Sequence, residues 1–254
     1  EKKGRETYDL WSLRTIGYVL VALLTASAGI YYAFFACFFL AAVGAYAAYR
    51  RKSLKRLLVA AIAIGIIGVA LLANLSPSLL YQNKYGKNEE AAKRYPIESE
   101  LFGMTIGQLV LPITNHRVDL LSDVKSEILK DANYVHETAV FYNENDHSSL
   151  GLIGSMGLLF SLGWLIFAGR CYIDKKKMDL PLLDTLGVLN ALGILFATIG
   201  GFGFVFAVLV SPGIRGYNRI SPYIAFFSII VVMIILEGLR RRYAKTIKND
   251  LIFC

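Results

Sequence analysis

Four clusters of Lys and Arg alternate with long apolar stretches along the chain, and this alternation restricts the fold more than any other feature. The clusters are Lys2, Lys3, Arg5 and Arg14; Arg50, Arg51, Lys52, Lys55 and Arg56; Arg170, Lys175, Lys176 and Lys177; and Arg240, Arg241, Arg242, Lys245 and Lys248. Cytoplasmic loops of membrane proteins collect basic residues. The pattern therefore predicts a multi-pass membrane protein with all four clusters and both termini in the cytoplasm.

The composition supports the membrane interpretation. Hydrophobic residues make up 56% of the chain and charged residues only 18%, with a mean hydropathy of +0.51, which is far from the balance of soluble domains. The net charge of +8 would fit nucleic acid binding, but 18 of the 27 Lys and Arg residues lie in the four clusters. Topology explains that excess, so we expect no nucleic acid partner.

The first apolar stretch is too long for one membrane crossing. Thr15 to Tyr49 is uncharged for 35 residues, which would make a helix of roughly 52 Å at about 1.5 Å per residue, against about 30 Å of hydrocarbon. Both flanks of this stretch are basic, so its two ends belong on one side of the membrane. We therefore predict a helical hairpin with its turn near Ser27, Ala28 and Gly29.

The predicted fold is an all-α membrane protein with about six transmembrane helices and one large extracytoplasmic loop. The expected spans are Asp9–Ala26, Ile30–Tyr49, Leu57–Leu75, Ser149–Ala168, Leu182–Val210 and Pro222–Leu239. The fifth is longer than a span requires and carries Gly200, Gly201 and Gly203, so we expect it to be tilted or kinked. The chain then divides into 1–75, with the first three helices, 76–148 as the outer loop, 149–239, with the last three helices, and a cytoplasmic tail at 240–254.

The large polar segment from Ser76 to His147 is too long to be only a connection. Leu101–Ile113 is apolar but too short to span, so we expect a helix there that lies in the interface or dips partly into the membrane and ends at Pro112. From Val118 to Ile128, apolar residues recur at helical spacing between charged residues, which predicts an amphipathic helix on the membrane surface.

A short external loop between the last two spans carries Arg215 and Arg219. External loops usually contain few Arg residues. The two are four residues apart, so one helical turn would place both guanidinium groups on one face, where their planar forks fit phosphate oxygens. The alternative partners are bulk phospholipid headgroups or a loop carboxylate.

Two further clusters in the outer loop are candidates for a site. Asn115, His116 and Arg117 follow the short apolar segment, and there a His can pass a proton and an Arg can share an anionic ligand; a solvated loop His is the alternative. The polar run from Tyr142 to His147, which includes Glu144, could bind a sugar or cation, although a helix-capping turn fits better. The three His residues have no metal-ligand spacing, so we predict no zinc site and leave a divalent cation open.

Three segments resemble those of a known superfamily: residues 29–35 at the start of a span, Leu111-Pro112 followed by residues 115–117, and residues 214–220 leading into an apolar span. They are similar to the later part of bacterial polytopic proteins described as sugar translocases or surface-polysaccharide modifiers, and to the GT-C superfamily of lipid-linked-sugar glycosyltransferases. The likeness covers most of the chain in order and hydropathy, but its motifs are short and degenerate. It implies an enzyme of the bacterial plasma membrane that transfers a sugar from a polyprenyl phosphate or pyrophosphate to a glycan acceptor on the outer face.

One feature of the superfamily is missing from its expected place. Its members usually carry a catalytic acidic residue in the first external loop, whereas the first external turn here has no Asp or Glu. We expect the catalytic residue to lie in an N-terminal portion preceding Glu1, or the chain to act with a partner subunit. The expected lipid-phosphate ligands are Arg215, Arg219, Arg117 and His116, and the expected substrate contacts are Asn115, Tyr217, Asn218 and Glu144. A polysaccharide polymerase or ligase, a lipid-linked-sugar flippase or transporter and a non-catalytic membrane scaffold remain as alternatives.

Overall fold

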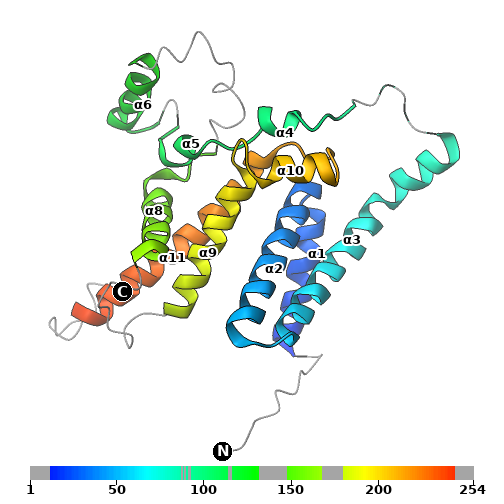
Figure 1. The fold of residues 1–254 in the computed structure, drawn as a ribbon, viewed down its shortest axis with the longest axis horizontal. Coiled ribbons are helices and arrows are strands. Elements are labelled where there is room, and N and C mark those ends of the chain that lie inside the picture. The colour runs from blue at the N-terminus through cyan, green and yellow to red at the C-terminus, as the bar shows by residue number, and fades with distance from the viewer. Residues whose placement is uncertain are drawn as a thin grey trace, which may run out of the picture. The chain divides into compact units, whose positions relative to one another are not determined.

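The computed structural model describes residues 12–86, 88, 90, 93–113, 116–131, 148–167 and 180–243. Their secondary structure is helical apart from turns and one isolated β-bridge. The chain forms two compact units, Glu1–Ala92 and Lys93–Cys254, whose helices are coloured along the chain in Figure 1. Within the described residues, the helices long and apolar enough to cross a membrane are Ile30–Arg51, Lys55–Tyr85, Leu180–Ala197 and Tyr217–Arg241.

An apolar helix lies in each of the six predicted spans. The other two are α1 (Leu13–Ser27) and α8 (Gly151–Phe167), of 15 and 17 residues. At about 1.5 Å per residue these are shorter than about 30 Å of hydrocarbon. The structure thus supports a membrane protein, while the count of six spans stays a prediction.

The first unit contains α1, α2 (Ile30–Arg51) and α3 (Lys55–Tyr85). The turn between α1 and α2 is at Ala28 and Gly29, as predicted, and Gly29 has a φ of +120° that residues with a side chain rarely adopt. Small side chains let the helices approach closely: a Cβ on Gly44 of α2 would lie 2.5 Å from the Cβ of Ala60 on α3. Close helix packing at small residues is typical of membrane bundles.

Helix α3 runs ten residues beyond the boundary predicted at Leu75 and continues through Pro77. Proline has no N–H to donate to the carbonyl four residues earlier, which is that of Ala73. The Ser76 hydroxyl donates to this carbonyl oxygen instead, at 2.7 Å. Such side-chain replacement is how helices in membranes tolerate proline, so the helix end predicted at Leu75 was too early, while the start of the outer loop at residue 76 stays a prediction.

The second unit is built on three packed helices: α8, α9 (Leu180–Ala197) and α11 (Ser221–Tyr243). Its closest crossing joins Gly157 of α8 to Ser228 of α11, where an added Cβ would lie 2.8 Å from the Ser228 carbonyl carbon. The side-chain amide of Asn190 on α9 donates to the hydroxyls of Ser161 on α8, at 3.0 Å, and of Ser228, at 3.4 Å. A buried polar cluster therefore links all three helices.

Two predicted helices are broken by one short backbone pairing. Met104 and Thr198 form a parallel β-bridge, in which Met104 N–H donates to Ala197 O at 2.8 Å and Ile199 N–H donates to Met104 O at 3.2 Å. In place of the predicted Leu101–Ile113 helix, α4 (Glu98–Leu101) ends where that helix was to begin, and the shorter α5 (Ile106–Val110) follows the pairing. The pairing also separates α9 from α10 (Phe202–Leu209), so the kink predicted near Gly200 is a complete break.

The predicted amphipathic helix is present as α6 (Asp119–Asp131), and its position on the membrane surface stays a prediction. Helix α5 ends at Val110 because Leu111 takes an extended backbone, with ψ of 147°. The residue before a proline is pushed out of the helical region, so the predicted stop at Pro112 is confirmed.

Candidate functional site

Several short elements form a layer at one end of the bundle of α8, α9 and α11. Figure 1 shows α4, α5 and α10 at the end where α9 finishes and where α8 and α11 begin. The short 3-10 helix η3 (Tyr217–Ile220) leads directly into α11 at this end. The basic residues Arg240 and Arg241 lie near the other end of α11, 23 residues long. From Ser221 to Arg240 the helix rises about 29 Å, which separates the layer from these basic residues.

Arg215 in this layer is held by an acidic and an aromatic residue of the 93–105 segment. Its Nη1 donates to Oε2 of Glu98 at 3.0 Å, and its guanidinium carbon lies 4.8 Å from the centre of the Phe102 ring. Arg94 also approaches Glu98 Oε2, at 3.6 Å. The Glu98 side chain is 15% exposed and that of Arg215 is 35% exposed. A loop carboxylate, one of the partners considered from the sequence, thus contacts Arg215.

The electrostatics of Glu98 follow from these contacts. Its Oε1 accepts the backbone N–H of Tyr95 at 3.2 Å. This hydrogen bond, followed by the hydrogen bond and positive charge of Arg215, lowers the pKa of the Glu98 carboxyl below its ordinary value. Glu98 is therefore ionised at neutral pH and keeps the Arg215 guanidinium in a fixed orientation.

The residues after Arg215 form the support of the loop. Tyr217 is 1% exposed and packs against Phe196 with the ring centres 5.5 Å apart. Asn218 is 3% exposed, and its N–H donates to Phe102 O at 3.4 Å. In this structure neither side chain lies at the surface, although both were expected to contact substrate. Arg219 is exposed.

The helical turn expected to align Arg215 and Arg219 is not formed. Helix η3 begins at Tyr217, and Gly216 before it has φ of −83° and ψ of 73°, outside the helical region. The spacing of four residues therefore does not by itself place the two guanidinium groups on one helix face. Whether they share a ligand stays a prediction.

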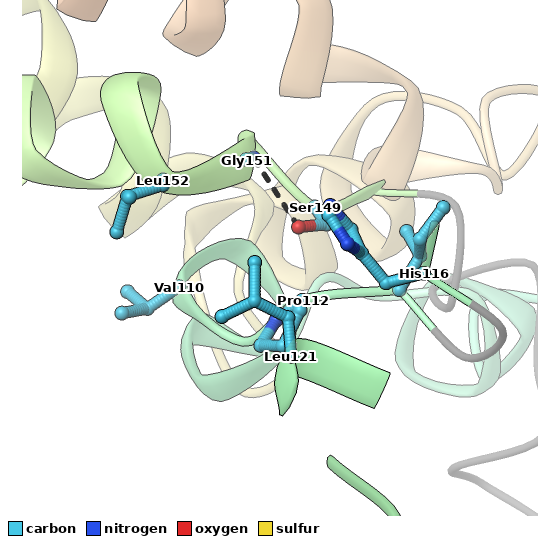
Figure 2. Close-up of a pocket in the computed structure, with 8 residues that line it drawn as sticks. Val110, Pro112, His116, Leu121, Ser149, Gly151 and Leu152 are labelled. Atoms are coloured by element: carbon cyan, nitrogen blue, oxygen red, sulfur yellow. Dashed lines mark hydrogen bonds between the residues drawn. The ribbon is translucent and has the colours of Figure 1, made fainter. Parts of the chain in front are cut away.

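His116 lies in a separate pocket of about 220 Å³ at the start of α8. The residues that line it are Val110, Pro112, Ile113, His116, Leu121, Ser149, Gly151 and Leu152. In Figure 2, Val110 and Leu152 lie on one side and His116 on the other. The His116 Nδ1 accepts the Val118 N–H at 3.0 Å, so the neutral ring carries its proton on Nε2.

Hydrogen bonds between α5 and the start of α8 hold the pocket open. The Ser149 hydroxyl donates to Leu111 O at 2.6 Å, and Leu150 N–H donates to Leu109 O at 3.0 Å. Ser149 Oγ also accepts the Gly151 N–H at 3.3 Å, the dashed line in Figure 2. These contacts use carbonyls at the end of α5 that lack helical partners.

The candidate residues thus fall into two groups that share no lining residue. Arg215, Tyr217, Asn218 and Arg219 belong to the layer around Glu98, whereas His116 lines the pocket next to Leu121. Arg117 is exposed. Asn115 and Glu144 lie outside the described residues. The structure therefore leaves the expected four-residue phosphate site as a prediction.

Sequence reasoning missed two acidic residues with specific partners. Glu98 was one of many charged residues in a long polar segment, and nothing local indicates its pairing with Arg215, 117 positions away. Asp184 of α9 accepts the Trp164 indole N–H at 2.9 Å. A carboxylate within an otherwise apolar helix is a recognisable signal, so Asp184 could have been found.

The chain was compared with models of protein families, with curated proteins and with solved structures, and no match was found in any of the three.

Proposed function

We propose that the chain is the donor-lipid-binding part of a membrane glycosyltransferase that uses a polyprenyl-phosphate-linked sugar on the outer face of the bacterial plasma membrane. The observation that supports this most is the fixed position of Arg215, between Glu98 and the Phe102 ring, four residues from the exposed Arg219. The superfamily and the enzymatic activity rest on the resemblance of sequence segments alone.

The position of this layer fits an external site. It lies at the end of α11 opposite to Arg240 and Arg241, and basic clusters mark the cytoplasmic side. The lipid phosphate would then meet Arg215 and Arg219 where the chain leaves the hydrocarbon.

The charges of the layer leave room for an anion. Three arginines, Arg94, Arg215 and Arg219, are accompanied by Glu98 and Glu100, and the Glu100 carboxylate also accepts the Gly200 N–H at 2.8 Å. The sum is one positive charge. Arg215 donates from Nη1 to Glu98, and the Arg219 side chain is exposed. Fixed cations beside a leaving phosphate stabilise the charge that develops there during transfer.

Binding of undecaprenyl phosphate to the protein in nanodiscs tests the proposal, with undecaprenol, which has the same chain without phosphate, as the reference. Arg215→Lys and Arg219→Lys keep the charge but lose the bidentate fork. Each should weaken phosphate-dependent binding about tenfold, as expected for a charge-assisted contact of about 1.5 kcal/mol. The matched control is Arg241→Lys, at the opposite end of α11. Unchanged binding in both loop variants contradicts the site.

Sugar transfer is a separate test of the enzymatic part. Membranes that carry the complete gene product should transfer sugar from the lipid-linked donor to the surface acceptor, and Arg215→Ala should reduce transfer more than Arg215→Lys. Normal phosphate binding without transfer would favour the scaffold alternative.

A flippase or transporter is the second candidate, favoured by the polar cluster of Asn190, Ser161 and Ser228 inside the helix bundle. Polar groups at membrane depth often mark a transport path. However, α8 and α11 cross closely at Gly157 and Ser228, which argues against a substrate path between these two helices. Loss of transport in Asn190→Leu with intact phosphate-lipid binding would reverse this preference.

A further inference from the structure

The pocket beside His116 is continuous with an apolar face of α8. Leu152 lines the pocket and is itself 67% exposed, and Ile153 and Met156 on the same helix are 63% and 61% exposed. Helix α8 packs against α9 and α11, both long enough to span a membrane. Its exposed apolar side chains therefore lie at a depth where their neighbours are lipid chains.

The size and lining of the pocket restrict what can enter it. Its volume of about 220 Å³ is below the range of about 300–1,000 Å³ typical of pockets that enclose a whole small ligand. Five of the eight lining residues are Val, Leu, Ile or Pro. A sugar ring would leave its hydroxyls without hydrogen bonds against these side chains. A segment of hydrocarbon chain fits both the volume and the lining.

The polar groups near the pocket carry both signs of charge. His116 has its Nδ1 occupied by Val118 N–H, so Nε2 remains as a donor. Arg117 follows it and is exposed, and Asp119, also exposed, begins α6. A donor and a cation suit a phosphate, and a nearby carboxylate suits an ammonium group. Such a mixture complements a zwitterionic headgroup better than a purely anionic one.

We propose that this pocket binds one acyl chain of a membrane phospholipid whose headgroup carries a phosphate and a primary amine. The phosphate lies at His116 and Arg117, and the amine lies at Asp119. The chain enters along Leu152 from the lipid-facing side of α8. This lipid differs from the sugar donor, and neither Arg215 nor Arg219 lines its site, so the two proposals can fail independently.

Photocrosslinking tests whether the pocket binds an acyl chain. The full chain is reconstituted in nanodiscs of phosphatidylethanolamine and phosphatidylglycerol that contain a phosphatidylethanolamine probe with a diazirine in one acyl chain. Crosslinked peptides should map to 106–113, 116–121 and 148–152. Leu121→Trp fills the pocket and should lose these crosslinks. Leu120→Trp changes the neighbouring residue of α6, which is 70% exposed and does not line the pocket, and should keep them.

A charge variant tests the headgroup without filling the pocket. The wild type should crosslink the phosphatidylethanolamine probe more strongly than the matching phosphatidylglycerol probe, and Asp119→Lys should reverse that order. Equal crosslinking of both probes by both proteins would overturn the headgroup assignment. The acyl-chain site would be overturned if crosslinks appeared only in other peptides, or if Leu121→Trp and Leu120→Trp lost the crosslinks equally. Stronger labelling of these peptides by a diazirine polyprenyl phosphate would also overturn it, because the pocket would then hold the donor.

Discussion

The crossing of α8 and α11 gives the sharpest quantitative prediction, for Gly157→Ala. The new Cβ would overlap the Ser228 carbonyl oxygen and lie 2.8 Å from its carbon, where ordinary contacts begin at 3.4 Å. The helices must therefore separate by at least about 0.6 Å, the difference between these distances. Overpacking lowers the free energy of unfolding by about 1–3 kcal/mol. Because a backbone carbonyl cannot rotate away as a side chain can, we expect a loss of about 3 kcal/mol. Part of this loss is offset, because alanine favours a helix over glycine by about 1 kcal/mol.

The net loss of unfolding free energy is therefore about 2 kcal/mol, or about a 30-fold larger unfolded fraction. Reversible unfolding by SDS in mixed micelles, followed by circular dichroism, measures it. Gly163→Ala on the same helix is the matched control, because an added Cβ there has no heavy atom within 4 Å; it should be stabilised by up to about 1 kcal/mol. If the two variants unfold at the same SDS fraction, the close crossing of α8 and α11 is wrong.

Three further predictions concern the buried amide, the topology and the external carboxylate. In the same assay, Asn190→Ala should lose about 1–3 kcal/mol through lost hydrogen bonds and a cavity. Asn190→Leu should stay within about 1 kcal/mol, because leucine fills the cavity; both variants remove a buried carbonyl oxygen that has no hydrogen bond in the described part of the chain. A cysteine at Asn88 should react with an impermeant thiol reagent in intact cells and one at Ser53 should not; the reverse result would invert the orientation. Amide-exchange protection of 98–102 should be higher in the wild type than in Glu98→Gln at pH 7. Folding lowers the pKa of Glu98 from its ordinary value of about 4.5. The stabilisation by the ionised Glu98 is therefore present above that value and should disappear as the pH falls through the lowered pKa. A difference in protection between wild type and Glu98→Gln that persists in acid would contradict the ion pair.

The helices were predictable because hydropathy and length act locally. The hairpin turn at Gly29, the stop before Pro112 and the amphipathic α6 each follow from a few neighbouring residues. The end of α3 was not predictable from proline alone, because Ser76 supplies the hydrogen bond that Pro77 cannot. A local rule fails where a neighbouring side chain compensates.

The candidate site was predictable as a list of residues but not as an arrangement. The arginines in a loop predicted to be external identified Arg215, whereas its contacts with Glu98 and Phe102 join segments more than 100 residues apart. The burial of Tyr217 depends on Phe196 from another helix. Without an alignment of related sequences, such distant pairings have no signature in one chain, and hydropathy cannot distinguish a polar loop residue that supports the loop from one that binds a ligand.

The pairing of the 98–105 segment with residues that follow α9 sets the order in which the protein can mature. The Glu100 carboxylate can bind the Gly200 N–H only after another 100 residues have been synthesised, and Glu98 can bind Arg215 only after another 117. At about 5–20 residues per second, synthesis needs roughly 5–20 seconds to supply those partners. During this interval α4 and α5 have been made, but the residues around Thr198 that pair with Met104 have not. The layer is therefore completed late: a chain interrupted before residue 198 would contain most of its membrane helices and the contacts of α5 with the start of α8, but neither the Glu100–Gly200 nor the Glu98–Arg215 hydrogen bond.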